Sequence, residues 1–242
     1  MAERLAILIS GGGTTMQEII KACQTGEINM EIACVISSNQ QAGGIEKAKK
    51  LKIPDKNVII INPQDYKNES GKVDLLLFGR KIITELQDRK VTIVSQNGWL
   101  PLTPEIVIDA FEGKIFNQHP GPVPEFGGKG MYGRRVHAAV ILFRRWTKGE
   151  MWTEVIAQRV GKIYDEGELL YTERVEILPT DTVDDLQQRA LPIEHRLQIQ
   201  LLIDIANGIV KNPVLRDPIV KLEEEEILKT AKKVAKLLFP TG

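Results

Sequence analysis

The stretch LAILISGGGTTMQEIIKA, residues 5–22, decides the fold that we predict for this chain. Its first five residues form a short apolar run, which is typical of a buried strand. Glycines follow at positions 11–13, and the apolar side chains after them recur with helical spacing. A strand, a glycine loop and a helix in this order are typical of the start of an α/β domain.

The rest of the chain repeats this alternation, which predicts a mostly parallel central sheet with covering helices. The expected strands are 31–37, 58–61, 91–94, 115–119, 153–160 and 169–177. The expected helices are 44–51, 72–90, 104–111, 136–143, 181–207 and 221–238. Prolines and glycines concentrate between 120 and 133, and since periodic structure resumes on both sides we interpret this stretch as a long functional loop.

Composition limits the class of protein. A chain of 242 residues with 43% apolar content can bury one substantial core. Its 32 basic and 32 acidic side chains cancel, which argues against tRNA or DNA as a partner. Cys23 and Cys34 are too few for a disulfide framework, so we expect free thiols in the cytoplasm. With no signal peptide and no apolar run near about 18 residues, we expect no membrane partner.

The segment Asn117-Gln118-His119-Pro120, with Asp165 46 residues after the histidine, is the strongest chemical signal. When an amine attacks a carbonyl carbon, charge grows on the oxygen and a proton must leave the nitrogen. Side chains two apart on a strand point to the same face, so Asn117 and His119 would enter one cleft. An amide, an imidazole and a carboxylate together could catalyse acyl transfer.

Other candidate motifs are ambiguous when taken singly. The glycine loop could present backbone N–H groups to a phosphate, or could be a structural turn. It matches neither G-x-G-x-x-G nor the Walker A pattern, which argues against a nucleoside triphosphate. The three histidines are scattered, and we expect no metal site.

Four motifs in the same order resemble those of the glycinamide ribonucleotide formyltransferases, the folate-dependent enzymes of purine synthesis. They are Leu8 to Gln17; Asn117 to Pro120 with Pro124 and Phe126 to Gly133; Tyr164 to Gly167; and Asp181, Asp184, Asp185, Arg189, Glu194 and His195. The resemblance covers about residues 4 to 208. It implies a Rossmann-like formyltransferase fold over residues 1–210, followed by a charged helical extension at 211–242.

The resemblance also implies the reaction, in which 10-formyltetrahydrofolate donates a formyl group to the primary amine of glycinamide ribonucleotide. Asn117, His119 and Asp165 would be catalytic. His119, kept cationic by Asp165, would help Asn117 stabilise the oxyanion, and Asp165 would order a water that relays the proton.

The same resemblance implies two binding regions, small-molecule substrates, and a monomer or homodimer. The phosphate and substrate region comprises Gly12, Gly13, Thr14, Thr15, Gly98, Pro120 and Glu194. The folate region comprises Leu100, Pro101, Leu102, Val160, Gly161, Lys162, Ile163 and Tyr164.

Several residues depart from the family pattern, and they leave the acceptor amine open. They are Thr14, Thr15, Pro101, Gln118 and Gln158, together with the segment 143–152. The alternatives are a formyltransferase for another amine such as an amino-sugar nucleotide, a formyltetrahydrofolate deformylase, and a non-catalytic relative that binds a folate or a phosphorylated metabolite.

Overall fold

A computed structural model describes residues 2–209 and 211–242. In these residues the strands follow the hydrogen-bonded order β3-β2-β1-β4-β5-β6-β7. The chain divides into two compact units, of which the first comprises Met1–Asn117 and Gln198–Val210 and the second Gln118–Leu197 and Lys211–Gly242. The predicted domain boundary falls at residue 210, outside the described residues, and stays a prediction.

The elements follow the predicted alternation. The strands are β1 Glu3–Ile9, β2 Met30–Ser37, β3 Val58–Ile60, β4 Ile93–Gln96, β5 Ile115–His119, β6 Trp152–Arg159 and β7 Leu169–Glu176. The α-helices are α1 Thr14–Thr25, α2 Gly43–Lys50, α3 Leu75–Asp88, α4 Glu105–Ala110, α5 Arg134–Thr147, α6 Val183–Ala206 and α7 Glu225–Leu238. Short 3₁₀ helices are Asp55–Asn57, Pro63–Tyr66 and Leu222–Glu224.

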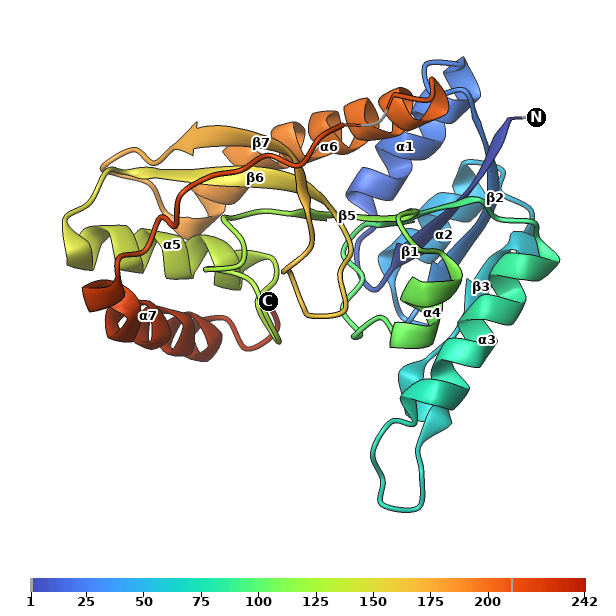
Figure 1. The fold of residues 1–242 in the computed structure, drawn as a ribbon, viewed down its shortest axis with the longest axis horizontal. Helices are drawn as coiled ribbons and strands as arrows, with labels where there is room; N and C mark the ends of the chain where they lie inside the picture. Colours follow the sequence, from blue (N-terminus) through green and yellow to red (C-terminus); the bar gives the residue numbers. More distant parts are fainter. Residues whose placement is uncertain (1, 210) are drawn as a thin grey trace. The chain divides into compact units, whose positions relative to one another are not determined.

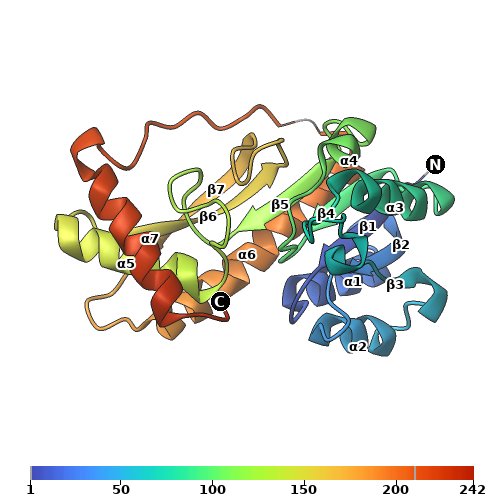
Figure 2. The ribbon, with the colours of Figure 1, turned by 90° about the horizontal axis from the view of Figure 1, so that it is seen from below.

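The first unit is a parallel sheet between two layers of helices, as predicted. β1 pairs in parallel with β2 and β4, and β4 pairs with β5 from Val94↔Ile115 to Gln96↔Asn117. β1 is buried on both faces, which explains why it reads as a continuous apolar run. The pairs α1–α2 and α3–α4 lie on opposite faces of this unit's sheet (Figure 2), because right-handed crossovers that leave the first strand in opposite directions place their helices on opposite sides.

Helix α3 starts three residues later than the periodicity predicts. The Asp74 side chain accepts hydrogen bonds from the N–H groups of Leu76, at 2.9 Å, and Leu77, at 3.0 Å. An aspartate in this role caps the helix and leaves the preceding residues outside it. The apolar periodicity could not locate this end because a cap is a local hydrogen bond rather than a burial pattern.

The second unit contains an antiparallel pair of strands and two packed helices. β6 and β7 pair from Trp152↔Glu176 to Gln158↔Leu169, with an irregularity next to Gln158. Helix α7 lies beside α5 (Figure 1) and buries Ala231 and Ala235. The predicted charged C-terminal helix is therefore part of this unit's packing.

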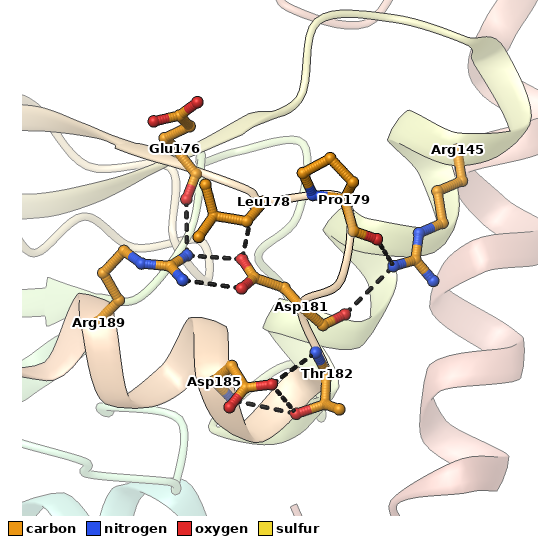
Figure 3. A network of polar contacts seen from close by, with 8 residues as sticks. All are labelled: Arg145, Glu176, Leu178, Pro179, Asp181, Thr182, Asp185 and Arg189. Carbon is orange, nitrogen blue, oxygen red and sulfur yellow. Dashed lines mark hydrogen bonds and ion pairs between the residues drawn. The ribbon is translucent and has the colours of Figure 1, made fainter.

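A polar network anchors the start of α6 in the second unit (Figure 3). Arg189 binds both carboxylate oxygens of Asp181, at 2.6 and 2.7 Å, and the Leu178 N–H donates to the same carboxylate. The hydrogen bonds from Arg189 are the main reason that the pKa of Asp181 is lowered. Thr182 and Asp185 form a reciprocal cap at the helix N-terminus. The network fixes the helix that carries Glu194.

Within the described residues, no helix combines the length and the apolar character needed to cross a membrane.

The glycine loop of the first unit brings two backbone segments very close together. Gly13 precedes α1 with a φ of 63°, in the left-handed region. A Cβ at Gly13 would lie 2.8 Å from the Cα of Gly44, and the N–H of Gly44 donates to Gly11 O at 3.0 Å. By contrast, a Cβ on Gly12 would meet no atom within 4 Å. Gly13 is thus required by both conformation and packing.

We expect Gly13→Ala to lower the free energy of unfolding by about 1–3 kcal/mol, because alanine in the left-handed region is strained and its methyl group would push against backbone. Gly12→Ala is the matched control and should change stability by less than about 1 kcal/mol. Urea denaturation of both variants measures the difference, and equal stabilities would contradict the packing argument.

Candidate active site

His119 lies at the end of β5 and is 4% exposed. Its Nδ1 is 2.9 Å from the carbonyl oxygen of Gly121. A carbonyl oxygen only accepts hydrogen bonds, so Nδ1 carries a proton and donates it. The other ring nitrogen, Nε2, is buried without a hydrogen-bond partner among the described residues and lies 3.8 Å from Oδ2 of Asp165. This nitrogen is therefore the candidate reactive end of the ring.

Asp165 occupies the turn after β6, where its φ of 56° places it in the left-handed region that aspartate tolerates better than most residues. Oδ2 accepts a hydrogen bond from the N–H of Gly128 at 2.8 Å. Oδ1 accepts a longer one, of 3.4 Å, from Gln158. The structure thus brings the predicted His119 and Asp165 together, and Gln158, one of the departures from the family pattern, contacts the same carboxylate.

Two glycines make this approach possible. A Cβ at Gly127 would lie 2.5 Å from the Cβ of Asp165. A Cβ at Gly167 would lie 1.7 Å from the carbonyl oxygen of Arg159. Real side chains do not pack this closely. Gly127 therefore lets the glycine-rich loop at 120–133 approach the Asp165 turn, and Gly167 lets that turn close back on the end of β6.

His137 is a buried residue near His119 that the sequence analysis did not single out. It lies on α5, is 1% exposed, and neither ring nitrogen has a partner in the part of the chain that the structure describes. Burial is the main reason that its pKa falls to about 4, and His119 lowers it further. His137 is thus a neutral imidazole close to His119. The available signal was its position inside the apolar run 136–141, which is unusual for a surface histidine.

Glu194, predicted to bind substrate, is 7% exposed on α6. Burial raises its pKa to about 7, and the hydrogen bond from Gln118 opposes this rise. Gln118 Nε2 donates to Glu194 Oε2 at 3.2 Å. Gln118 stands where the family pattern has an apolar residue. It therefore forms a hydrogen bond to a residue that is predicted to bind substrate.

The predicted phosphate residues Gly12, Gly13, Thr14 and Thr15 lie together at the N-terminus of α1 in the first unit. Gly12 and Thr14 are exposed, whereas Thr15 is buried. Ser10 Oγ lies 2.6 Å from Ser38 Oγ and accepts a hydrogen bond from the N–H of Leu100 at 2.9 Å. This serine ties the glycine loop to the loop that follows β4.

The loop after β4 contains Gly98, which is exposed with a φ of 73°. Trp99 anchors this loop by stacking on Phe78, with ring centroids 6.2 Å apart. The predicted folate residue Leu100 is 42% exposed; Pro101 and Leu102, beside it, are half-buried.

The predicted folate segment of the second unit, Val160 to Tyr164, precedes Asp165. Ile163 is 61% exposed, and Lys162 is also exposed. Burial, with a smaller contribution from Asp165, raises the pKa of Tyr164 to about 12. Tyr164 therefore stays a neutral phenol that can donate a hydrogen bond at neutral pH.

The candidate residues fall into two groups. Those of the first unit are Gly12, Gly13, Thr14, Thr15, Gly98, Leu100, Pro101, Leu102 and Asn117. Those of the second unit are His119, Pro120, Val160 to Tyr164, Asp165 and Glu194. Strand β5 carries Asn117 and His119 two residues apart. In the described ranges, no cluster of three His, Cys, Asp or Glu side chains could hold a metal ion; the absence of a metal stays a prediction.

A family model described as formyl transferase matches residues 3–202 of this chain. The match covers more than half of the sequence and includes every candidate site residue named above. The chain belongs to the formyl transferase family.

Two proteins similar to this chain are named phosphoribosylglycinamide formyltransferases. The phosphoribosylglycinamide formyltransferase of Haemophilus influenzae is 29% identical over 195 residues, which cover 81% of this chain and 83% of that protein. The chloroplastic phosphoribosylglycinamide formyltransferase of Vigna unguiculata is 32% identical over 200 residues, 83% of this chain. The chain spans 60% of that plant protein's length.

The fold comparison agrees. The crystal structure of glycinamide ribonucleotide transformylase 1 from Symbiobacterium toebii superposes with a TM-score of 0.73 at 26% identity, and the match covers 89% of this chain and 95% of that one. The predicted α/β fold with a mostly parallel sheet is confirmed.

The raised pKa of Glu194 predicts how stability depends on pH. The folded state holds this proton more tightly than the unfolded chain, whose glutamates ionise near 4.5. Its favourable contribution is therefore complete below that value and is lost as the pH rises through about 7. Glu194→Gln keeps the shape but cannot ionise. Between about pH 5 and about pH 8, its stability should rise relative to the parent by on the order of 1–3 kcal/mol.

Thermal unfolding at the two pH values measures this difference. The matched control is Glu223→Gln, at an exposed carboxylate of the same chain, which should follow the parent at both pH values. If the stabilities of the Glu194 and Glu223 variants changed equally with pH, the pKa of Glu194 would not be raised by burial.

Proposed function

We propose that this chain transfers the formyl group of 10-formyltetrahydrofolate to the primary amine of glycinamide ribonucleotide. Membership of the formyl transferase family and the names of its relatives support the reaction class. The observation that carries the proposal is the buried His119 Nε2, which has no hydrogen-bond partner among the described residues and faces the Asp165 carboxylate at 3.8 Å.

In this reaction the amine nitrogen attacks the formyl carbon, and the carbonyl oxygen becomes an oxyanion. The Asn117 amide and the His119 Nε2–H donate to that oxygen in the tetrahedral intermediate. The bond between the formyl carbon and the folate nitrogen then breaks. The proton lost by the attacking amine moves to the departing nitrogen through a water held by Asp165, so tetrahydrofolate leaves as a neutral amine.

The acceptor's single phosphate would bind at the N-terminus of α1. Backbone N–H groups in the first turn of a helix point away from the helix and attract anions. No acidic side chain lies in the first turn of α1, and Gly11, Gly12 and Thr14 are exposed there. These features support one phosphate, and the loop has no lysine of the kind that nucleoside triphosphate loops use.

The folate donor would use exposed apolar side chains of each unit. Leu100 and Ile163 are large apolar residues that remain 42% and 61% exposed, each in its own unit. Flat heteroaromatic ligands commonly bind to such surfaces. The neutral Tyr164 phenol next to Asp165 would add a hydrogen-bond donor.

We also propose a cytoplasmic location and small-molecule substrates. The two cysteines are free thiols, and burial raises the pKa of each to about 12. Such thiols are unreactive and are usual in a reducing compartment.

Purified protein should form formylated glycinamide ribonucleotide only when both substrates are present, as followed by absorbance of the folate product. Asn117→Ala and His119→Ala should each lower kcat by about 10²–10³ with little change in either KM, because the oxyanion exists only after attack. Formylation of an amino-sugar nucleotide instead, or hydrolysis of the folate without an acceptor, would replace this proposal with one of its alternatives.

The phosphate site can be tested at Gly12, where a side chain meets no other atom. Gly12→Asp places a negative charge beside the proposed phosphate, so the acceptor KM should rise about tenfold or more while the folate KM stays within about twofold. Gly12→Ala controls for the added side chain and should resemble the parent. A similar rise in both KM values would place the phosphate elsewhere.

A further inference from the structure

Two lysines of the C-terminal helix α7 form hydrogen bonds to the glycine-rich loop at 120–133. Lys232 Nζ donates to the carbonyl oxygens of Glu125, at 2.9 Å, and Gly127, at 2.7 Å. Lys236 Nζ donates to the carbonyl oxygen of Lys129 at 2.9 Å. These residues all belong to the second unit. The loop is therefore tied to a helix that follows it by about a hundred residues.

One peptide group connects this contact with the candidate active site. The carbonyl oxygen of Gly127 accepts from Lys232, and the N–H of Gly128 donates to Asp165 Oδ2 at 2.8 Å. This C=O and this N–H belong to the same planar unit, so movement of one moves the other. A cation hydrogen-bonded to the oxygen also polarises the peptide and makes its N–H a stronger donor.

The charge of Lys232 acts in the same direction. Its ammonium group is partly buried, which lowers its pKa, and Lys236 lowers it further, whereas Asp165 and Glu125 raise it. The ammonium group and the Asp165 carboxylate attract each other, so the charge of Lys232 helps to hold that carboxylate in place. Lys233, the next residue on α7, is exposed.

We propose that Lys232 is a positioning residue for Asp165, acting through the Gly127–Gly128 peptide to hold the carboxylate in its orientation toward His119. The proposal rests on the proposed catalytic function of Asp165. It gives the C-terminal extension a role in formyl transfer that the family motifs, which end before residue 210, do not include.

The loop has a second, independent attachment, so loss of Lys232 should not unfold it. Arg216 binds both carboxylate oxygens of Glu125, at 3.0 and 2.6 Å, and donates to Val123 O at 2.6 Å. It also forms an ion pair with Glu154 at 3.0 Å. Burial raises the pKa of Glu125, but the hydrogen bonds from Arg216 outweigh it and the net pKa is lowered. This attachment holds the start of the loop and leaves the Gly127–Gly128 peptide to Lys232.

The test compares Lys232→Met with Lys233→Met. Each variant replaces one of two adjacent lysines with the same neutral side chain of similar length. Lys232→Met should lower kcat by about tenfold to a hundredfold with both KM values within about twofold, because small displacements of a catalytic group carry costs of this size. Lys233→Met should match the parent. Lys232→Arg keeps a cation and donors and should recover most of the turnover.

A double-mutant cycle with Asp165→Asn separates positioning from general support of the fold. If Lys232 acts through Asp165, then Lys232→Met should change the single-turnover rate of Asp165→Asn by less than about threefold. Additive losses would overturn the positioning role, as would normal kcat in folded Lys232→Met. If Lys232→Met does not fold by circular dichroism, Lys232→Gln, which keeps a donor, takes its place in the cycle with the same criterion.

The cycle also distinguishes the two proposals. Loss of turnover in Asp165→Asn without any loss in Lys232→Met would overturn the positioning role alone. Normal turnover in Asp165→Asn would overturn the proposed catalytic function, and the role of Lys232 with it.

Discussion

The second unit depends on keeping one carboxylate, that of Asp165, beside a buried histidine. A charge withdrawn from water is costly unless donors replace the water. The N–H of Gly128 and the amide of Gln158 supply such donors, and His119 Nε2 lies 3.8 Å away. Asp165 has a left-handed backbone in this turn, and the missing side chain of Gly127 lets the loop approach it, since a Cβ there would lie 2.5 Å from the Cβ of Asp165.

Other polar side chains of the same unit are stabilised in different ways. Some are paired with an opposite charge, and others are uncharged. Glu125 is paired twice over by Arg216 and serves the loop's position. Burial instead favours the uncharged forms of His137 and Glu194, because it lowers the pKa of His137 to about 4 and raises the pKa of Glu194 to about 7. A carboxyl group that titrates near pH 7 can respond to a ligand, whereas a fully paired one cannot.

The family motifs named candidate site residues, but they did not indicate which residues support them. Asn117-x-His119 and the turn at Asp165 carry their chemistry in short, contiguous segments, so the sequence was sufficient to name them. Gln118 and Gln158 were noted only as departures, and their contacts with Glu194 and Asp165 became visible in the structure. Lys232 lies in a charged amphipathic helix, where one lysine cannot be distinguished from its neighbours by pattern.

Local sequence determined the alternation of strands and helices, the glycine loop before α1 and the choice of candidate reactive side chains, because periodicity and backbone freedom act over a few residues. Tertiary structure alone decided that the N–H of Gly128 binds Asp165, that His137 is buried close to His119, and that Lys232 binds Gly127 across a hundred residues of chain. Such contacts depend on where distant segments pack, and burial, which sets the pKa of Glu194 and His137, is a property of that packing.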